Sequence, residues 1–303
     1  MEKRTTPIEA GAIDQNPLAE DFRKRSQAKD IWRRLRRNKM AMIGMVMVLI
    51  LLIAAVFAPI IAPYDPAAQD LTQLKQMPSP AHLLGTDDYG RDILSRIIFG
   101  GRVSLMVAIL AIVVGLLLGG IIGVSSGYFG GIYDGIIMRI MDIIMAIPGF
   151  LLAVCISAAL GSGIFNTALA IGIGCIPSYA RMFRALVLEV RDQEYIEAAR
   201  ITGSSNIRIM IKQIVPNILS PIIVDTTLRV GGCILMISSL SFIGLGVQPP
   251  TPEWGSMLSA GRQYIREFYP IVVFPSLAIM MTLFGFNLFG DGLRDAMDPK
   301  LKN

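Results

Sequence analysis

The sequence is short of charge, and its few cysteines and single histidine are not placed to bind a metal. Only 17% of the residues are charged, against about a quarter in ordinary soluble domains, while 53% are hydrophobic and the mean hydropathy is +0.57. Cys155, Cys175 and Cys233 each lie in an apolar run, and His82 lies in a proline-rich connection, with no second ligand nearby. We therefore expect no zinc or haem site, and the composition indicates a membrane protein.

A nucleotide-binding motif is also missing. The chain has no GxxxxGK[ST] phosphate loop and no Gly-Lys dipeptide, so any ATP that drives it must be hydrolysed by another chain. Residues 1–39 hold eleven Lys or Arg and six Asp or Glu, whereas the rest of the chain carries seventeen of each. The basic excess belongs to this tail, so we expect no nucleic-acid partner.

Long apolar stretches predict six membrane-spanning helices, because a bilayer core about 30 Å thick needs roughly 20 apolar residues of helix. Five stretches reach that length, namely 41–62, 103–124, 143–180, 216–247 and 268–290. The third is too long for one crossing, and Gly161-Ser162-Gly163 is its natural break. The first begins near residue 40, too far along the chain for a cleavable signal peptide. We expect an all-α integral membrane protein.

The orientation follows from the basic residues near the ends of the spans, since cytoplasmic segments carry the excess of Lys and Arg. Five of them lie within residues 33–39, directly before the first span. We therefore expect the N-terminus in the cytoplasm, and six crossings return the C-terminus there. Residues 63–100 and 248–267 then face outward, and residues 125–134 and 189–215 face inward.

Four glycines spaced by four residues mark one ridge of the second span. Gly115, Gly119, Gly123 and Gly127 let a neighbouring backbone approach closely, so we expect a packing seam, although a role in lining a pathway is the alternative. Two of these glycines also make 123–127 a formal GxSxG hydrolase motif around Ser125. No strand precedes it and the single histidine lies in an outer loop, so we do not favour a hydrolase.

Charged pairs interrupt two of the apolar spans. Asp225 and Arg229 are four residues apart and share one helical face, and Arg139 and Asp142 are three apart at the inner start of the third span. Each is interpreted as a structural ion pair, with contact to a transported substrate as the alternative. Pro148, followed by a glycine, is expected to bend the third helix.

A short polar segment between the fourth and fifth spans predicts two small helices. The stretch 194–206, followed by 207–215, reads as two short helices, with Gly203 in the left-handed position after the first and Ser205 or Asn206 as the cap of the second. Pro216 marks the turn into the next span. In the second helix one apolar stripe is expected, formed by Ile207, Met210, Ile211 and Ile214.

The first of these helices presents a flat surface of small side chains, which a cleft in another protein could approach closely. Glu197, Ala198 and Ala199 are followed by three residues, Gly203, and then twelve residues to Pro216. This spacing resembles the EAA loop of binding-protein-dependent ABC importer permeases, although Gln213 and Val215 stand where family members often have Ile and Leu. The resemblance implies a coupling helix seated in a groove of a cytoplasmic ATPase. The alternative is a purely structural role, in which the amphipathic hairpin packs against the helix bundle of the same chain.

Further segments resemble the C-type permeases of peptide and nickel importers, which include the dipeptide, oligopeptide and glutathione permeases. The matching segments are 32–39, 85–96, 240–246, 248–255, 290–295 and 298–300. The resemblance implies the type I (MetI-like) permease fold and the following layout: a basic cytoplasmic tail 1–39, a first helix 40–62, an outer loop 63–100, a permease domain 101–290 with its coupling loop at 189–216, and a cytoplasmic tail 291–303.

The resemblance also implies partners. They are a homologous B-type permease, two cytoplasmic ABC ATPase subunits or domains that bind ATP and Mg, and an extracytoplasmic substrate-binding protein, all at the inner membrane. Arg91 and Glu253 would be docking contacts for the binding protein. From the residues alone, Asp87, Arg91, Asp92 and Arg96 predict a solvated salt-bridge cluster instead.

The resemblance makes peptide the expected cargo, with nickel, glutathione and opines left open. An ion-coupled secondary transporter is a competing function, but no internal repeat is evident, and the charged residues within spans lie mostly near their ends.

Overall fold

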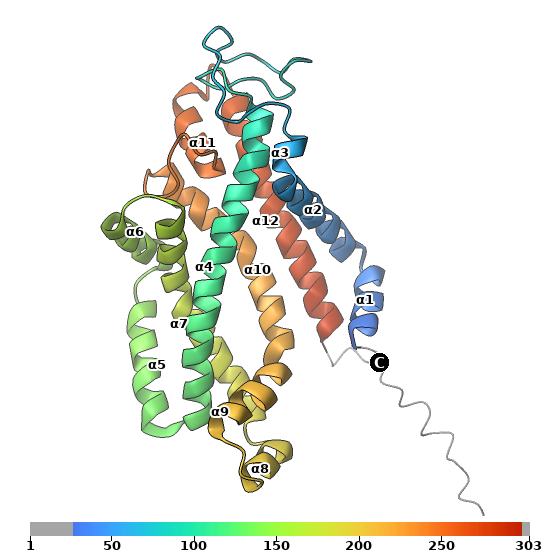
Figure 1. Ribbon diagram of the computed structural model, residues 1–303, viewed down its shortest axis with the longest axis vertical. Helices are drawn as coiled ribbons and strands as arrows, with labels where there is room; N and C mark the ends of the chain where they lie inside the picture. The colour runs from blue at the N-terminus through green and yellow to red at the C-terminus, as the bar shows by residue number, and fades with distance from the viewer. Residues whose placement is uncertain (1–26, 299–303) are drawn as a thin grey trace, which may run out of the picture.

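The computed structural model describes residues 27–298, which form helices and no β-strand (Figure 1). The helices are α1 (Gln27–Arg37), α2 (Lys39–Val56), α3 (Ala58–Ile61), α4 (Ile93–Phe129), α5 (Gly131–Met145), α6 (Gly149–Leu160), α7 (Ile164–Val190), α8 (Glu194–Ile201), α9 (Asn206–Ile209), a π-helical turn (Met210–Ile214), α10 (Val215–Phe242), α11 (Trp254–Gly261), a 3₁₀ turn (Arg262–Tyr264) and α12 (Pro270–Met297). The predicted tails 1–39 and 291–303 lie partly outside the described residues.

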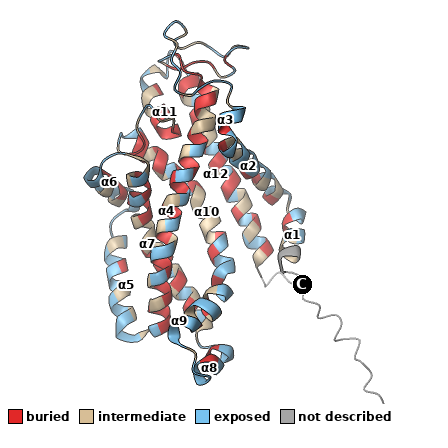
Figure 2. Cartoon of the chain, in the orientation of Figure 1, coloured by how far each residue is buried: buried red, intermediate tan, exposed pale blue. Residues whose placement is uncertain are grey.

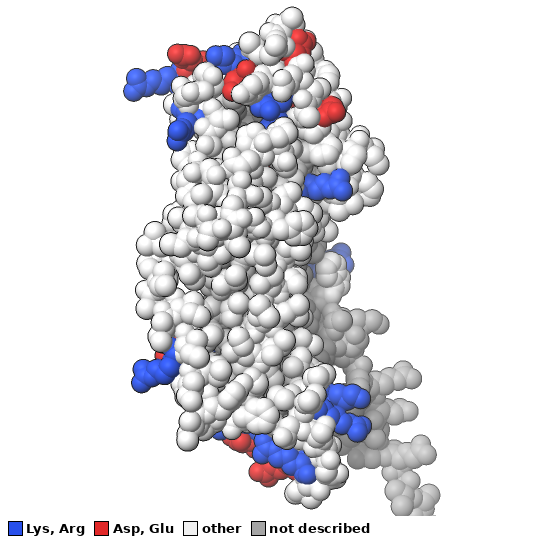
Figure 3. All heavy atoms as spheres, turned by 60° about the vertical axis from the view of Figure 1, so that its left-hand side comes forward, with Lys and Arg blue, Asp and Glu red and all other residues white. Residues whose placement is uncertain are grey.

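Five helical segments are long and apolar enough to cross a membrane: α2, α4, α7, the stretch from α9 through α10, and α12. The pair α5 and α6 makes a sixth if its two parts count as one span, in agreement with the six predicted crossings. These two helices meet at 84° around Pro148, which confirms the predicted bend. On the face seen in Figure 3, charged side chains gather toward the two ends and leave an uncharged band between them.

Several helices extend beyond the charge-free stretches, so the predicted boundaries need correction. The predicted outer loop 63–100 already contains the start of α4, because Asp92 caps that helix at its N-terminus. The third crossing begins at Gly131, which puts Arg139 and Asp142 within the helix. The helix α12 continues to Met297. A helix can continue past a charged residue when the side chain of that residue forms an ion pair or reaches water.

The helix α4 is the central element, and α7 is its main partner. At 37 residues it is about 55 Å long, which exceeds the apolar core of a bilayer. All four glycines of the predicted ridge face α7. A Cβ atom at Gly119 would lie 2.6 Å from the Tyr179 Cβ, and one at Gly123 would lie 2.3 Å from the Ala180 carbonyl oxygen. The ridge is therefore a packing seam, as predicted.

Burial is greatest where α4, α7, α10 and α12 meet, whereas α5 and α6 are largely exposed (Figure 2). Isoleucines recur along the exposed side of α5, and Ile132, Ile136, Ile140 and Ile143 are all exposed. An apolar helix face of this kind is stable only against lipid or another apolar protein surface. The hairpin of α8 and α9 and the long loop before α4 lie at opposite ends of the molecule (Figure 1).

Candidate functional site

The predicted hairpin is present, and its first turn has the expected geometry. After α8, Gly203 has a φ of +77°, the left-handed conformation that glycine adopts at low cost. The backbone N–H of Ser204 donates to the Ala199 carbonyl at 3.0 Å, which completes a Schellman-type end. Ser205 is the residue that caps α9, and its hydroxyl accepts from the Arg208 N–H at 3.4 Å.

The three residues of the Glu-Ala-Ala segment are exposed to different degrees. Ala199 is buried together with Ile196, and both pack in an apolar cluster with residues of α4 and α7. Glu197 and Ala198 are exposed. Nothing lies within 4 Å of a Cβ atom built at Gly203. One side of α8 thus anchors the hairpin, and the other side offers an open surface.

The hairpin is tied to the end of α4 by contacts that the sequence did not predict. The Tyr128 hydroxyl bonds to the Asn206 side chain at 2.9 Å, and the Arg200 guanidinium lies 5.3 Å from the centre of the Tyr128 ring. Arg191 donates to the Gly127 carbonyl at 2.9 Å. Movement of the hairpin would therefore be transmitted directly to α4. No sequence signal identifies Tyr128 beyond its place after the last glycine of the ridge.

The second half of the hairpin differs from the prediction. The chain does not turn at Pro216, because α9 continues through a π-helical turn into α10, where Pro216 occupies the first turn. Of the predicted stripe, Ile214 is fully buried, but Ile207 and Ile211 are exposed, and Ile209, which lies outside the stripe, is fully buried as well. Ile209 and Ile214 both pack in the apolar cluster with residues of α4 and α7, so contacts with these helices decide which side of the segment is buried.

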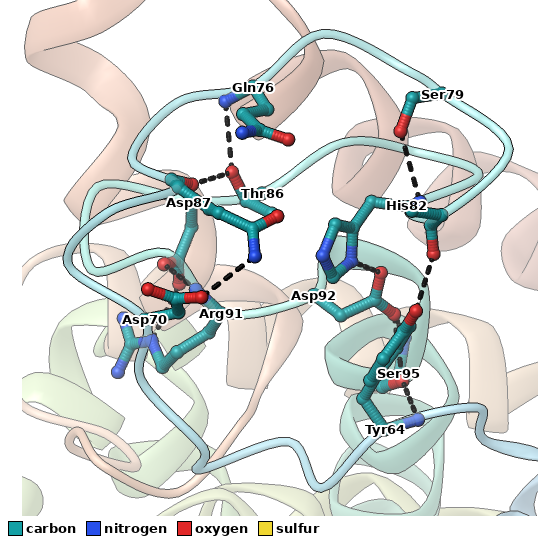
Figure 4. Close-up of polar contacts among 12 residues, drawn as sticks. Tyr64, Asp70, Gln76, Ser79, His82, Thr86, Asp87, Arg91, Asp92 and Ser95 are labelled. Carbon is teal, nitrogen blue, oxygen red and sulfur yellow. Dashed lines mark hydrogen bonds and ion pairs between the residues drawn. The ribbon is translucent and has the colours of Figure 1, made fainter.

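At the opposite end, charged side chains organise the long outer loop (Figure 4). The Asp87 carboxylate accepts from the Arg91 Nε at 2.7 Å and lies 3.4 Å from the Arg96 Nε. The cluster exists as predicted, but it is buried rather than solvated, since all three residues are at most 5% exposed. Asp92 is not part of this cluster.

Asp92 forms a second network that fixes the loop to the start of α4. Its carboxylate accepts from the Ser95 N–H at 2.8 Å and hydroxyl at 2.7 Å, and lies 2.9 Å from the His82 Nδ1. The Tyr64 N–H donates to the Ser95 hydroxyl at 3.1 Å. Residues from three parts of the loop are thus held on one helix cap (Figure 4).

The two residues predicted as docking contacts are buried. Glu253 caps α11, accepts from the Ser256 N–H at 2.9 Å and the Ser104 hydroxyl at 3.2 Å, and is fully buried. Arg91 is only 5% exposed in the Asp87 cluster. Neither side chain offers surface to another protein in this conformation, so both residues stabilise the outer loops from within.

Of the two charged pairs within spans, one forms and the other does not. Asp225 and Arg229 form the predicted ion pair, and Arg229 also donates to the Ser178 hydroxyl at 3.2 Å. Arg139 is exposed and does not pair with Asp142, which instead bonds to Arg181 of α7 at 2.7 Å. The ion pair of Asp142 therefore joins α5 to α7, whereas that of Asp225 and Arg229 lies along α10.

The formal hydrolase motif has no catalytic base. The Ser125 hydroxyl donates to the Ile122 carbonyl at 3.0 Å and lies 3.2 Å from the Tyr133 hydroxyl. The only histidine of the chain, His82, is held at the other end of α4. A helix of this length separates the two by roughly 50 Å, so they do not form a catalytic pair.

Asp88 provides a test of the electrostatics of the outer loop. Burial raises the pKa of its carboxyl, and the neighbouring charge of Asp87 adds to this, while Arg91 at 3.9 Å offsets only part of it. A pKa raised by folding means that the ionised form opposes folding, and this penalty disappears as the pH falls toward the pKa of the unfolded state.

We expect Asp88→Asn to raise the thermal unfolding midpoint in detergent by about 1–2 °C at neutral pH. This gain should vanish near about pH 4. A lower midpoint at neutral pH would show that the attraction to Arg91 prevails.

Comparison with known proteins gives two family matches. Residues 115–303 match the family described as binding-protein-dependent transport system inner membrane component. Residues 26–78 match the N-terminal TM domain of oligopeptide transport permease C. Together they cover α1 to α3, the second part of α4 and all later helices, and they leave residues 79–114 unmatched.

Individual relatives align over nearly the whole chain. The dipeptide transport system permease protein DppC of Escherichia coli (strain K12) is 51% identical over 90% of this chain and 93% of its own length. The di/tripeptide transport system permease protein DppC of Pseudomonas aeruginosa (strain UCBPP-PA14) is 43% identical over 92% and 94%. The glutathione transport system permease protein GsiD of Escherichia coli O157:H7 is 44% identical over 96% of both chains.

Among solved structures, an inward-facing form of the MetNI methionine ABC transporter has the same fold. The TM-score is 0.54 at 19% sequence identity, over 66% of this chain and 96% of the MetNI chain. This likeness supports the MetI-like fold and nothing more specific. With the family matches and the relatives above, it identifies the chain as a member of the binding-protein-dependent transport system inner membrane components, the permease family of type I ABC importers.

Proposed function

We propose that the chain is the C-type subunit of an importer for short peptides, forming the pathway together with a homologous B-type permease. The names of the relatives support this cargo, since two of the three are dipeptide or di/tripeptide permeases. The exposed isoleucines of α5 are a surface that either the second permease or lipid would cover.

The hairpin of α8 and α9 would receive the ATPase. The single observation that carries this assignment is the division of α8, where Ile196 and Ala199 are anchored in the core while Glu197 and Ala198 are exposed beside the open space at Gly203. A rigid element with one open side suits a surface that must transmit force. Two separate ATPase subunits or domains, with their ATP and Mg, would supply the energy. When the ATPases close, they would open the pathway between the two permeases toward the outside.

This assignment places the hairpin and both termini in the cytoplasm. The long outer loop would then face the substrate-binding protein. Its charges are paired internally, so the loop would present a preformed shape rather than free charges. We do not assign docking to Arg91 or Glu253, because both are buried.

Glutathione is the second candidate cargo, because a glutathione permease is 44% identical over 96% of the chain. An ion-coupled transporter is also testable, since its uptake would follow a proton or sodium gradient and ignore the ATPase.

The test is uptake by the reconstituted complex. The chain, its partner permease, the ATPases and the binding protein are placed in proteoliposomes, and labelled dialanine and glutathione are supplied separately. We expect dialanine uptake that requires ATP and disappears when the phosphate-loop lysine of the ATPase is replaced. Uptake of glutathione alone would replace the proposed cargo. Uptake that survives loss of the ATPase would contradict the mechanism.

A further inference from the structure

A cavity of about 820 Å³ lies between α1, α7, α10 and α12, on the same side of the spans as the hairpin. In Figure 1, α10 and α12 diverge toward this end. The volume is within the roughly 300–1,000 Å³ of typical ligand pockets. The lining combines apolar side chains such as Leu186 and Leu228 with six charged residues. The cavity is open on one side, and Glu189 and Arg294 are exposed in it, so its charged lining suits water or a polar occupant.

The charges differ between the two walls. On α7 and α10 the charged lining residues are Glu189 and Asp225, both acidic. On α1 and α12 they include the basic Arg34 and Arg294, together with two acids that are already engaged. Of those two acids, Asp30 forms an ion pair with Arg33 at 3.6 Å, and Asp298 is not without a partner.

Two of these charges are available to a ligand. Asp225 is neutralised by Arg229, and Arg34 donates to the Asp298 carbonyl at 3.3 Å. By contrast, the side chains of Glu189 and Arg294 form neither an ion pair nor a hydrogen bond within residues 27–298, whereas Arg34, which also lacks an ion pair, is held by its bond to the carbonyl. An unpaired acid on one wall thus faces the same space as an unpaired base from the other wall.

We propose that this cavity holds a peptide in transit, with Glu189 receiving its ammonium group and Arg294 its carboxylate. The inference rests on the proposed function, and it would apply to any short peptide with two free termini. A carboxylate and a guanidinium are complementary to the two ends of such a zwitterion. The side chains of the peptide would meet the apolar lining, which discriminates little between them.

The experiment measures protection of a cysteine in the cavity. Leu186→Cys is introduced into a chain whose Cys155, Cys175 and Cys233 are replaced by alanine, and the complete importer is assembled in nanodiscs without nucleotide. The rate of labelling by a charged maleimide is measured against increasing dialanine, N-acetyl-dialanine and dialaninamide. We expect dialanine to protect best, and each blocked peptide to need about three- to fivefold more, the contribution of one solvated ion pair.

Charge-neutral variants then assign each terminus. Glu189→Gln should weaken protection by dialanine about three- to fivefold and leave protection by N-acetyl-dialanine unchanged. Arg294→Gln should likewise weaken protection by dialanine and leave protection by dialaninamide unchanged. Asp192→Asn and Arg36→Gln, at exposed positions outside the cavity lining, are the matched controls. Equal protection by all three peptides would overturn the proposal. The proposal would also fail if the maleimide labelled Leu186→Cys in the isolated chain but not in the peptide-free complex, because another subunit would then fill the cavity. Dialanine uptake by the same complex is measured in parallel, so that failure of the cavity site is distinguished from failure of the proposed function.

Discussion

Replacing Gly123 by leucine should prevent the chain from folding. A Cβ atom at this position would lie 2.3 Å from the Ala180 carbonyl oxygen and 2.7 Å from the Phe183 Cβ. The first of these atoms belongs to the backbone of α7, so no side-chain rotation relieves the clash. The cost should exceed the roughly 1–3 kcal/mol of ordinary overpacking, because α4 and α7 must separate along their length.

The measurement is the amount of monodisperse chain recovered from membranes in mild detergent, together with its unfolding midpoint. Gly232→Leu is the matched control, since Gly232 is also in a long helix but has open space around its Cβ position. We expect full recovery for the control and almost none for Gly123→Leu. Comparable recovery of the two would mean that α4 and α7 do not pack as closely as described.

Replacing Gly203 by tryptophan should abolish transport and leave the folded chain in the membrane. Within residues 27–298 no atom other than those of Gly203 and its two chain neighbours lies within 4 Å of the Cβ position, so the side chain would enter the space assigned to the ATPase. Disruption at the centre of an interface typically costs 2 kcal/mol or more, and we expect uptake to fall at least about tenfold.

Gly203→Asn separates bulk from backbone strain, because asparagine tolerates the left-handed conformation that the φ of +77° requires. It should keep most of the activity. Uptake, recovery of the chain and co-purification of the ATPase are measured for both variants. Normal uptake and normal ATPase binding by Gly203→Trp would disprove the coupling assignment.

Features that depend on local spacing were predictable from the sequence. The four glycines fall on one ridge because they are spaced by four, and Pro148 bends the third helix because it removes a backbone donor. The break before α7 follows from Gly161 and Gly163, whose positive φ angles suit a turn. The spacing also predicted Gly203 at the end of α8.

Features that depend on contacts between distant segments were not predictable. Asp142 pairs with a residue 39 positions away, whereas helical spacing pointed to Arg139. Glu253 is buried because it bonds to Ser104, which lies 149 positions earlier. Ile209 is fully buried although it lies outside the predicted stripe, because it packs in the apolar cluster with residues of α4 and α7.

The most direct test of the coupling hairpin is cross-linking from Ala198, which is exposed on α8. Ala198→Cys is placed in the chain without native cysteines, and a bifunctional maleimide is added to inside-out membrane vesicles that contain the complete importer. We expect a cross-link to the ATPase whose yield changes when ATP binds, and no labelling by an impermeant maleimide added to intact cells. Labelling from outside the cell, or a cross-link only to the binding protein, would contradict the assignment.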